Sequence, residues 1–440
     1  MGMGPDLGDL SGIVATAWQQ ALGRDGPDRG RSFLVEGGDS LRAAVLRAQL
    51  AEQLGRELSI SEVLTARSLA ALTQLLLARA PRATVAPRDL TPAADPCSRL
   101  TFAQERMWFL HELTSATAAY HVTQALRFRG PFDPDAMQAA FDALSGRHAV
   151  LRAAVMSRGG APYPVAGAAE VPTLRIVALD TASHDTLATL DEFLLEFVNA
   201  PFHLTRGPLM RAAVIRLGDD DTVMVLAMHH IVADQWSLDI LWRDLAEAYG
   251  QAVIGTPITF SASAPILAEY AQAERDRFRP DRRDAELAYW RERLRGLQPI
   301  ELNSDFLRPP AQSFRGSRLR VDFGLREIAT LRGVAAERGA SLAALLLAAL
   351  KVQLHRHTGR SDLAVGMPVA NRPDVRAQSL VGTLINTLVI RSDPLSDLRR
   401  RAATRGYVLT EALEHQQLPS RCWCSRSTCR GIPAVRRCSR

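Results

Sequence analysis

The sequence is poor in cysteine, with 5 in 440 residues, and four of the five lie after residue 419. It also lacks any run of about 18 apolar residues, so no membrane-spanning helix is predicted. The first ten residues, MGMGPDLGDL, lack the basic and then apolar pattern of a secretion signal. The absence of both a span and a signal predicts a cytoplasmic protein.

The chain also has no large excess of positive or negative charge. The 53 Lys and Arg residues stand against 47 Asp and Glu residues, which gives a net charge of +6. Arginine-rich segments such as DRRDAELAYWRER mix both signs at helical spacing, as on a solvated helix face. Neither a nucleic acid nor a membrane is therefore expected as a partner. With 47% hydrophobic residues, the chain can bury large cores in more than one domain.

Two adjacent histidines stand where a predicted strand ends. Residues 222–228, TVMVLAM, form a short apolar run of the kind that predicts a buried strand. His229 and His230 follow it, then Asp234, and Ser237 opens an amphipathic segment that predicts a helix. Imidazole exchanges protons near neutral pH, so this position is a candidate catalytic site. Taken alone, histidines at a strand end are more often structural.

The histidine segment has a family resemblance that other segments share. Residues 228–237, MHHIVADQWS, resemble the HHxxxD signature of condensation domains of nonribosomal peptide synthetases, in the superfamily of chloramphenicol acetyltransferase. Further motifs of this family are matched in the same chain order by 100–110 (LTFAQERMWFL), 147–155 (RHAVLRAAV), 366–372 (GMPVANR) and 381–391 (VGTLINTLVIR). Five matches in order make the resemblance specific.

Three positions within these motifs bear on structure. Thr101 and Gln104 form a capping box, which predicts that a helix begins there. His148 is interpreted as a structural hydrogen-bonding residue rather than a second catalyst. Gln235 replaces the glycine that the family usually has after the aspartate, and its larger side chain is expected to narrow the acceptor side of the channel.

The amino-terminal part reads as four helices over residues 8–80. Within it, residues 32–41, SFLVEGGDSL, resemble the FxxxGGxSL motif of peptidyl carrier proteins. Ser40 would then carry covalent 4'-phosphopantetheine, and a helix N-terminus is a favourable place for a phosphodiester. The alternative is an ordinary helix in which Asp39 or Ser40 is only the N-cap.

We therefore predict four segments. A carrier domain spans 8–80, a proline-rich linker 81–97, a condensation domain 98–419 with an incomplete second lobe, and an unrelated tail 420–440. The tail's cysteines lack paired CxxC spacing and histidines, so no metal site is predicted. A disulfide framework would conflict with a cytoplasmic setting. A reading-frame shift near residue 420 is the hypothesis that accounts for this composition.

The resemblance implies a fold and residue roles. It implies a small all-α four-helix carrier domain followed by an α/β two-lobed chloramphenicol acetyltransferase-like domain, with the histidines at the floor of a V-shaped cleft. His230 would be catalytic, as a base or a positioning group, and His229 structural. Asp234 would hold the loop and pair with an arginine, for which Arg372 is the candidate. Ser237 and Asn386 would line or support the cleft.

The implied reaction is aminolysis of a thioester, in which one carrier-bound amine attacks a second carrier-bound acyl group. The partners would be a phosphopantetheinyl transferase, an adenylation domain acting in trans and a downstream carrier domain on another chain. Three alternatives stay open: an epimerisation domain, a catalytically dead carrier and binding platform, and an acyltransferase that uses a soluble thioester. Trp236 precedes Ser237, which is the reverse of the usual epimerisation order and favours condensation.

Overall fold

The structure is a computed structural model of the chain. It describes residues 7–23, 26, 28–56, 58–79, 99–114, 118–167, 169–179, 186–307, 314, 316–317, 319–393, 405–420 and 422. The predicted linker and nearly all of the predicted tail thus lie outside the described residues. The chain divides into two compact units: unit 1 is Met1–Arg88, Pro280–Gln378 and Asn386–Arg440, and unit 2 is Asp89–Arg279 and Ser379–Ile385. The domain boundaries predicted from the sequence stay a prediction.

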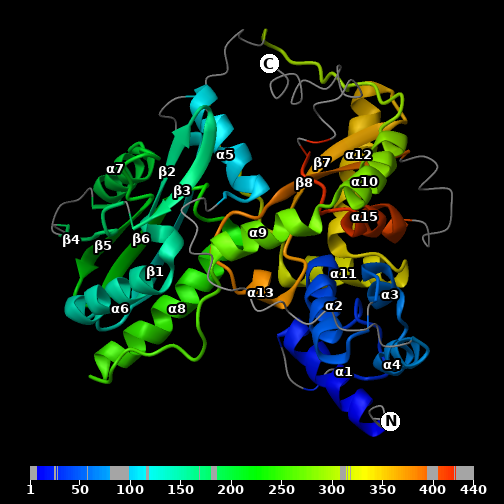
Figure 1. Ribbon diagram of the computed structural model, residues 1–440, viewed down its shortest axis with the longest axis horizontal. Helices are drawn as coiled ribbons and strands as arrows, with labels where there is room; N and C mark the ends of the chain where they lie inside the picture. The colour runs from blue at the N-terminus through cyan, green and yellow to red at the C-terminus, as the bar shows by residue number, and fades with distance from the viewer. Residues whose placement is uncertain are drawn as a thin grey trace. The chain divides into compact units, whose positions relative to one another are not determined.

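Unit 1 begins with the four helices that the sequence predicts (Figure 1): α1 (Leu7–Leu22), α2 (Ser40–Leu54), α3 (Ile60–Thr65) and α4 (Leu69–Leu77). Their apolar faces meet in a small core, because one helix of this length cannot bury its apolar stripe alone. Trp18 and Phe33 meet in this core, edge to face at 5.0 Å between ring centroids, and both are fully buried.

The rest of unit 1 is α/β. Its elements are α10 (Pro280–Arg293), α11 (Leu325–Glu337), α12 (Leu342–Thr358), β7 (Leu363–Val369), α13 (Val375–Gln378), β8 (Asn386–Ser392) and α15 (Arg405–Glu414). β7 and β8 pair antiparallel. α12 begins with the Ser341 hydroxyl as its N-cap and ends at Gly359, whose φ of 68° is left-handed.

Unit 2 contains the predicted histidine segment. Its elements are α5 (Phe102–Thr114), η1 (Ala118–Tyr120), β1 (His121–Arg129), α6 (Pro134–Arg147), η2 (Ala149–Arg152), β2 (Ala153–Arg158), β3 (Ala161–Ala166), β4 (Leu174–Ala178), α7 (Thr186–Asn199), β5 (Met210–Gly218), β6 (Asp221–His229), α8 (Gln235–Val253) and α9 (Leu267–Arg277). The main sheet has the order β1-β6-β5-β4, in which only β4 and β5 are parallel, and β2 pairs with β3 separately.

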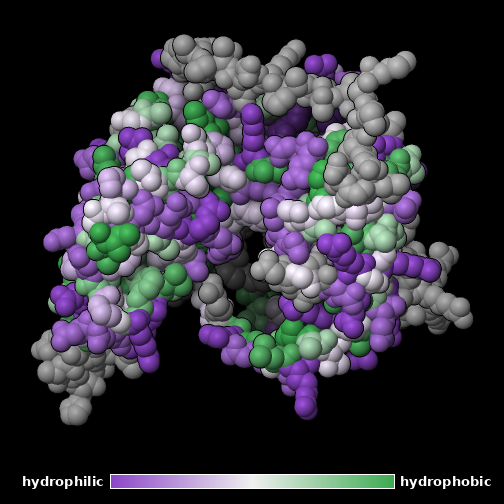
Figure 2. Space-filling view, turned by 90° about the horizontal axis from the view of Figure 1, so that it is seen from below, coloured by the Kyte–Doolittle hydropathy of each residue, from purple (hydrophilic) through white to green (hydrophobic). Residues whose placement is uncertain are grey.

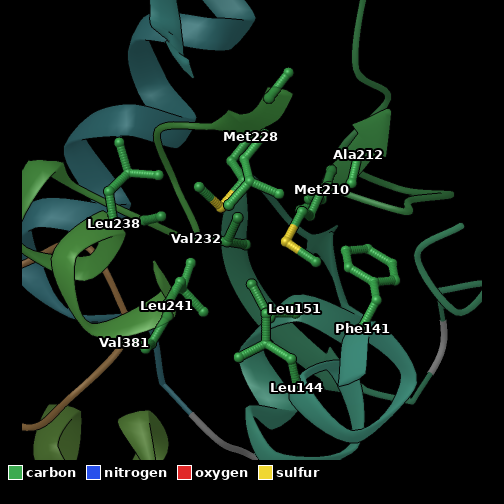
Figure 3. Packing of buried hydrophobic residues seen from close by; sticks show 14 of the residues in the cluster. Phe141, Leu144, Leu151, Met210, Ala212, Met228, Val232, Leu238, Leu241 and Val381 are labelled. Atoms are coloured by element: carbon green, nitrogen blue, oxygen red, sulfur yellow. The ribbon is translucent and has the colours of Figure 1, made fainter. Parts of the chain in front are cut away.

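The central strands β5 and β6 are covered on both faces. Alternate residues of a strand point to opposite faces. Ala212, Val214, Met224 and Leu226 join a core cluster with α6 and α8, part of which Figure 3 shows. The intervening residues of both strands join a second cluster with α7. The buried strand predicted at 222–228 is thereby confirmed, and its end is held rigidly within the sheet.

The surface is mixed. On the face shown in Figure 2, hydrophilic residues predominate and apolar residues form small groups between them. Unit 1 nevertheless exposes several large apolar side chains near its α11 helix: Phe306, Leu307, Leu319, Val321 and Leu325. Among the described residues no single helix is long and apolar enough to span a membrane, although α11 and α12, bent by 92°, reach that length and composition as a pair.

Candidate active site

The histidine segment is a tight loop between β6 and α8 in unit 2. The His230 amide donates to the carbonyl of Tyr120 at 2.7 Å, and the Val232 amide donates to the carbonyl of His229 at 3.0 Å. The Thr383 hydroxyl donates to the carbonyl of His230. The backbone of both histidines is thus fixed by neighbours from three chain segments.

His229 is completely buried, which fits the structural role expected for it. Its Nδ1 accepts a hydrogen bond from the Ile231 amide at 3.1 Å, so in the neutral ring the proton sits on Nε2. Nε2 lies 3.2 Å from Nδ1 of His111, to which it donates. Burial, followed by the nearby imidazoles of His111, His121 and His230, lowers the pKa of His229 to about 3. The ring is therefore neutral at physiological pH.

His111 and His121 complete a cluster around His229 that the sequence analysis missed. His111 lies on α5, and its ring meets the His229 ring edge to face at 5.0 Å. His121 stands directly opposite His229 in the β1–β6 register, and its Nδ1 donates to the Val198 carbonyl at 2.7 Å. Burial lowers the pKa of both His111 and His121. No local sequence pattern marks either residue, because the approach of His121 to His229 depends on the register of β1 against β6.

His230 has the opposite character. Its side chain is partly exposed, and its Nδ1 donates to the Ala233 carbonyl at 2.9 Å. This bond fixes the proton of the neutral ring on Nδ1 and leaves the lone pair on Nε2. Among the described residues no hydrogen bond to Nε2 is seen. A lone pair that is held in a fixed direction and is engaged by no described residue can accept a hydrogen bond or a proton from a bound substrate.

Asp234 closes the loop. It is completely buried and is the N-cap of α8: its Oδ1 accepts from the Ser237 amide at 2.9 Å and from the Ser237 hydroxyl at 2.7 Å. Its Oδ2 accepts from the Leu384 amide at 3.2 Å. The prediction that Ser237 opens the helix is wrong, because α8 begins at Gln235. The Asp234 carboxylate serves as the N-cap because it accepts from the backbone amide three residues later, which is that of Ser237, the third residue of the helix.

Ser237 and Thr101 connect distant chain segments to residues 379–385. The buried Ser237 hydroxyl accepts from the Gly382 amide at 3.0 Å. The Thr101 hydroxyl donates to the Thr383 carbonyl at 3.0 Å. The predicted capping box is confirmed, since the Thr101 and Gln104 side chains each bond to the other's amide at 3.1 Å. The Gln104 amide group also donates to the Ile231 carbonyl at 2.9 Å, which ties the start of α5 to the histidine loop.

His148 lies elsewhere in unit 2. It is buried, and its Nε2 bonds to the Asp244 carboxylate at 2.9 Å, beside Arg147 Nε at 2.8 Å. Burial raises the pKa of Asp244, but hydrogen bonds from His148, Arg243 and Arg147 outweigh it and hold that pKa well below its usual range. These contacts fit the interpretation of His148 as a structural residue.

Arg372 and Asn386 belong to unit 1. Arg372 is buried, and its Nη1 donates to the Ala377 carbonyl at 2.5 Å. Its pairing with Asp234 stays a prediction. The Asn386 amide group donates to the carbonyls of Gln416 and Leu418 at 2.8 and 2.7 Å, so this side chain joins the start of β8 to the segment after α15.

Ser40 is the first residue of α2. Asp39, the residue before it, caps the helix: its Oδ1 accepts from the Arg42 amide at 2.9 Å. Before it, Gly37 has a φ of 90°, and a Cβ on Gly38 would stand 2.3 Å from the Phe33 ring. The two glycines therefore bring the turn close to the domain core. Ser40 thus occupies a helix start, the position that the carrier motif predicts for the modified serine.

No group of three or more His, Cys, Asp or Glu residues is placed to hold a metal ion in the part of the chain that the structure describes. The rings of His111, His121 and His229 bond to one another or to the backbone instead.

Comparison with protein families identifies both parts of the chain. The condensation domain model matches residues 97–421, and the phosphopantetheine attachment site model matches residues 13–76. The chain therefore belongs to the condensation domain family and carries a phosphopantetheine-binding domain before it. The family resemblance, the helical carrier followed by an α/β domain of the chloramphenicol acetyltransferase type, and the covalent 4'-phosphopantetheine predicted for the carrier are confirmed.

Similar proteins include very large synthetases. Malpibaldin synthetase of Mortierella alpina is 31% identical over 94% of this chain, and the match covers 8% of that protein. The probable non-canonical nonribosomal peptide synthetase CymA of Salinispora arenicola is 34% identical over 87% of this chain, and the match covers 5% of it. The chain thus spans less than a tenth of the length of these relatives.

Solved structures resemble this fold. The X-domain from teicoplanin biosynthesis matches with a TM-score of 0.65 and 26% identity, over 75% of this chain and 73% of that one. The first condensation domain of the CDA synthetase matches with a TM-score of 0.63 and 22% identity, over 73% of this chain and 77% of that one, and shows the fold alone.

Proposed function

We propose that this chain forms amide bonds in nonribosomal peptide synthesis. The donor is an acyl group held on its own carrier domain at Ser40, and the acceptor is an amine held on a carrier domain of another chain. The observation that carries the proposal is the contrast between the two histidines: His229 is buried and hydrogen-bonded at both ring nitrogens, whereas His230 is partly exposed with its Nε2 lone pair oriented by Ala233.

The phosphopantetheine, when bound, supplies a terminal thiol that holds the acyl group as a thioester on a long arm. During aminolysis the amine nitrogen forms the new C–N bond and loses a proton, the C–S bond breaks, and the phosphopantetheine sulfur leaves and takes up a proton as the free thiol. Nε2 of His230 can accept that proton, or it can position the amine by a hydrogen bond. The loop that holds it is tied down, because Thr383 and Gln104 donate to the carbonyls of His230 and Ile231 and the Asp234 carboxylate accepts from the Leu384 amide.

The proposal includes partners. A phosphopantetheinyl transferase would modify Ser40, an adenylation domain in trans would load it, and a downstream carrier would bring the acceptor. A cytoplasmic location is part of the proposal and is supported by the single cysteine before residue 420, Cys97.

The modification is tested by intact mass. The chain is incubated with coenzyme A and a phosphopantetheinyl transferase, and the mass should rise by one phosphopantetheinyl group. Ser40→Ala should abolish the gain. A gain that persists in Ser40→Ala would overturn the assignment of the carrier site.

The catalytic role of His230 is tested by amide formation. The chain is loaded with an acyl group and supplied with an aminoacyl-loaded acceptor carrier. His230→Ala should lose at least about a hundredfold in rate, since a positioned acid–base group contributes about that factor or more. His357→Ala, which removes an exposed imidazole from α12, should leave the rate unchanged. Equal rates in wild type and His230→Ala would contradict the assignment.

A second candidate function is a binding platform without chemistry. It is supported by the structural match to the X-domain in its complex with OxyB from teicoplanin biosynthesis, at 27% identity and a TM-score of 0.65. If this function holds, the loaded chain forms no amide in either variant but retains a partner enzyme. The same assay therefore separates the two candidates.

A further inference from the structure

Glu414, the last residue of α15, contacts two helices of the carrier domain. Its Oε1 accepts a hydrogen bond from the Ile60 amide at 2.6 Å, and its Oε2 lies 3.3 Å from Nη1 of Arg47 on α2. Both carboxylate oxygens are thus engaged by residues more than 350 positions earlier in the sequence. All three residues belong to unit 1, and Figure 1 draws α3 beside α15.

The Ile60 amide finds no other acceptor within the described part of the carrier domain. α3 starts with a capping box, in which the Ser59 hydroxyl binds the Glu62 amide and the Glu62 carboxylate binds the Ser59 amide. These two hydrogen bonds satisfy the amides of Ser59 and Glu62, but the amide of Ile60 still needs an acceptor. Glu414 supplies the acceptor, and a hydrogen bond to a charged oxygen is stronger than one to a neutral oxygen.

A second patch of unit 1 packs against the carrier. α2, the helix that begins with Ser40, contacts the short helix α13. α13 in turn is held by Arg372, whose Nη1 donates to the Ala377 carbonyl. The carrier's α2 and α3 therefore meet α13 and α15 on the same unit.

We infer that α13 and α15 form the docking surface for this chain's own carrier domain, with Glu414 as the residue that recognises it. The inference rests on the proposed function only in naming the docked carrier as the donor. The Arg47–Glu414 ion pair is partly exposed, with 20% of the Arg47 and 31% of the Glu414 side chain accessible. Exposed ion pairs are weak, so the dock is reversible, as a carrier that must also visit a loading enzyme requires.

Hydrogen exchange of the full-length chain tests the dock without any turnover. In Glu414→Arg the ion pair becomes a like-charge contact and the Ile60 amide loses its acceptor. Exchange in the segment that contains Ile60, and in α15, should rise about tenfold, because like charges at a contact disfavour it strongly. Glu414→Gln keeps an acceptor for Ile60 but loses the charge, and its exchange should be intermediate.

Charge reversal supplies the matched controls. Arg47→Glu should raise exchange in the same two segments. The double variant Arg47→Glu with Glu414→Arg should partly restore the slow hydrogen exchange of α15, because the ion pair is restored but the hydrogen bond to the Ile60 amide is not. Arg67→Glu reverses an exposed charge of the same domain away from the contact and should change nothing.

The possible outcomes distinguish docking of the carrier domain from amide formation. If Glu414→Arg leaves exchange in both segments unchanged, the docking assignment is wrong, whatever the chain catalyses. If protection rises with protein concentration, the carrier of a second copy occupies the surface and docking within one chain is wrong. If exchange responds as expected but the loaded chain forms no amide, the dock stands and the proposed function fails.

Discussion

Nε2 of His229 donates to Nδ1 of His111 across 3.2 Å, although 118 positions separate the two residues in the sequence. The bond connects the end of β6 to α5, next to His230 in the chain. His111→Phe should therefore destabilise the protein by about 1–3 kcal/mol, because it leaves the buried Nε2–H of His229 without an acceptor. The free energy of unfolding from urea titration measures the effect.

His111→Gln is the matched control for that prediction. Its side-chain carbonyl can accept the His229 proton, so it should recover most of the lost stability. If His111→Phe and wild type unfold at the same urea concentration, the bond contributes nothing to the fold.

The same cluster predicts a loss of stability in acid. The pKa of His229 is about 3 in the folded protein, against an ordinary value of 6.5, so the unfolded chain binds the proton more readily. Stability is then full above pH 6.5 and falls as the pH drops from 6.5 towards 3. At pH 5 the loss from this residue is about 2 kcal/mol, and the lowered pKa of His111 and His121 acts in the same direction.

Urea unfolding at pH 7 and pH 5 checks this dependence. In His229→Gln the decrease between the two pH values should be smaller than in wild type by about 2 kcal/mol. An identical decrease in both proteins would mean that His229 is protonated in the folded state at pH 5.

The sequence predicted the elements of the site but not their contacts. β6 was visible as an apolar run, and the start of α5 was visible from Thr101 and Gln104, since both signals are local. The start of α8 was misplaced because Asp234 and Ser237 are both good caps, and only the folded chain shows which one is used. His121 opposite His229 depends on the register of β1 against β6, which no local pattern specifies.

The contacts of residues 379–385 could not be predicted from the sequence either, because their partners lie far away along the chain. The bond between the Gly382 amide and the Ser237 hydroxyl joins positions 145 apart. Ser237→Ala should cost about 1–3 kcal/mol, because it leaves the buried Gly382 amide without this acceptor. Thermal unfolding measures the loss.

Ser237→Thr keeps a hydroxyl at the same position and is the control, although its added methyl group must fit a buried site. If Ser237→Ala were as stable as wild type while its amide-forming rate fell, the hydroxyl would act on the reaction rather than on the fold.

The turn before Ser40 has little room for side chains. A Cβ on Gly38 would stand 2.3 Å from Cδ1 of Phe33 and 2.5 Å from its carbonyl oxygen, and Phe33 is fully buried against Trp18. Gly38→Ala should therefore destabilise the carrier helices by about 1–3 kcal/mol, since neither the backbone oxygen nor the packed ring can move aside freely. It should also slow the transfer of phosphopantetheine to Ser40, because the turn that precedes α2 must shift.

Gly12→Ala is the matched control for Gly38→Ala in the same domain. Gly12 lies on the exposed face of α1 with open space around its Cα, so an alanine there should stabilise the helix by about 0.5–1 kcal/mol and leave the transfer rate unchanged. Thermal unfolding and the initial rate of mass gain with coenzyme A measure both variants. Equal stability and equal rates for Gly38→Ala and Gly12→Ala would show that the close approach of Gly38 to Phe33 does not shape the turn that presents Ser40.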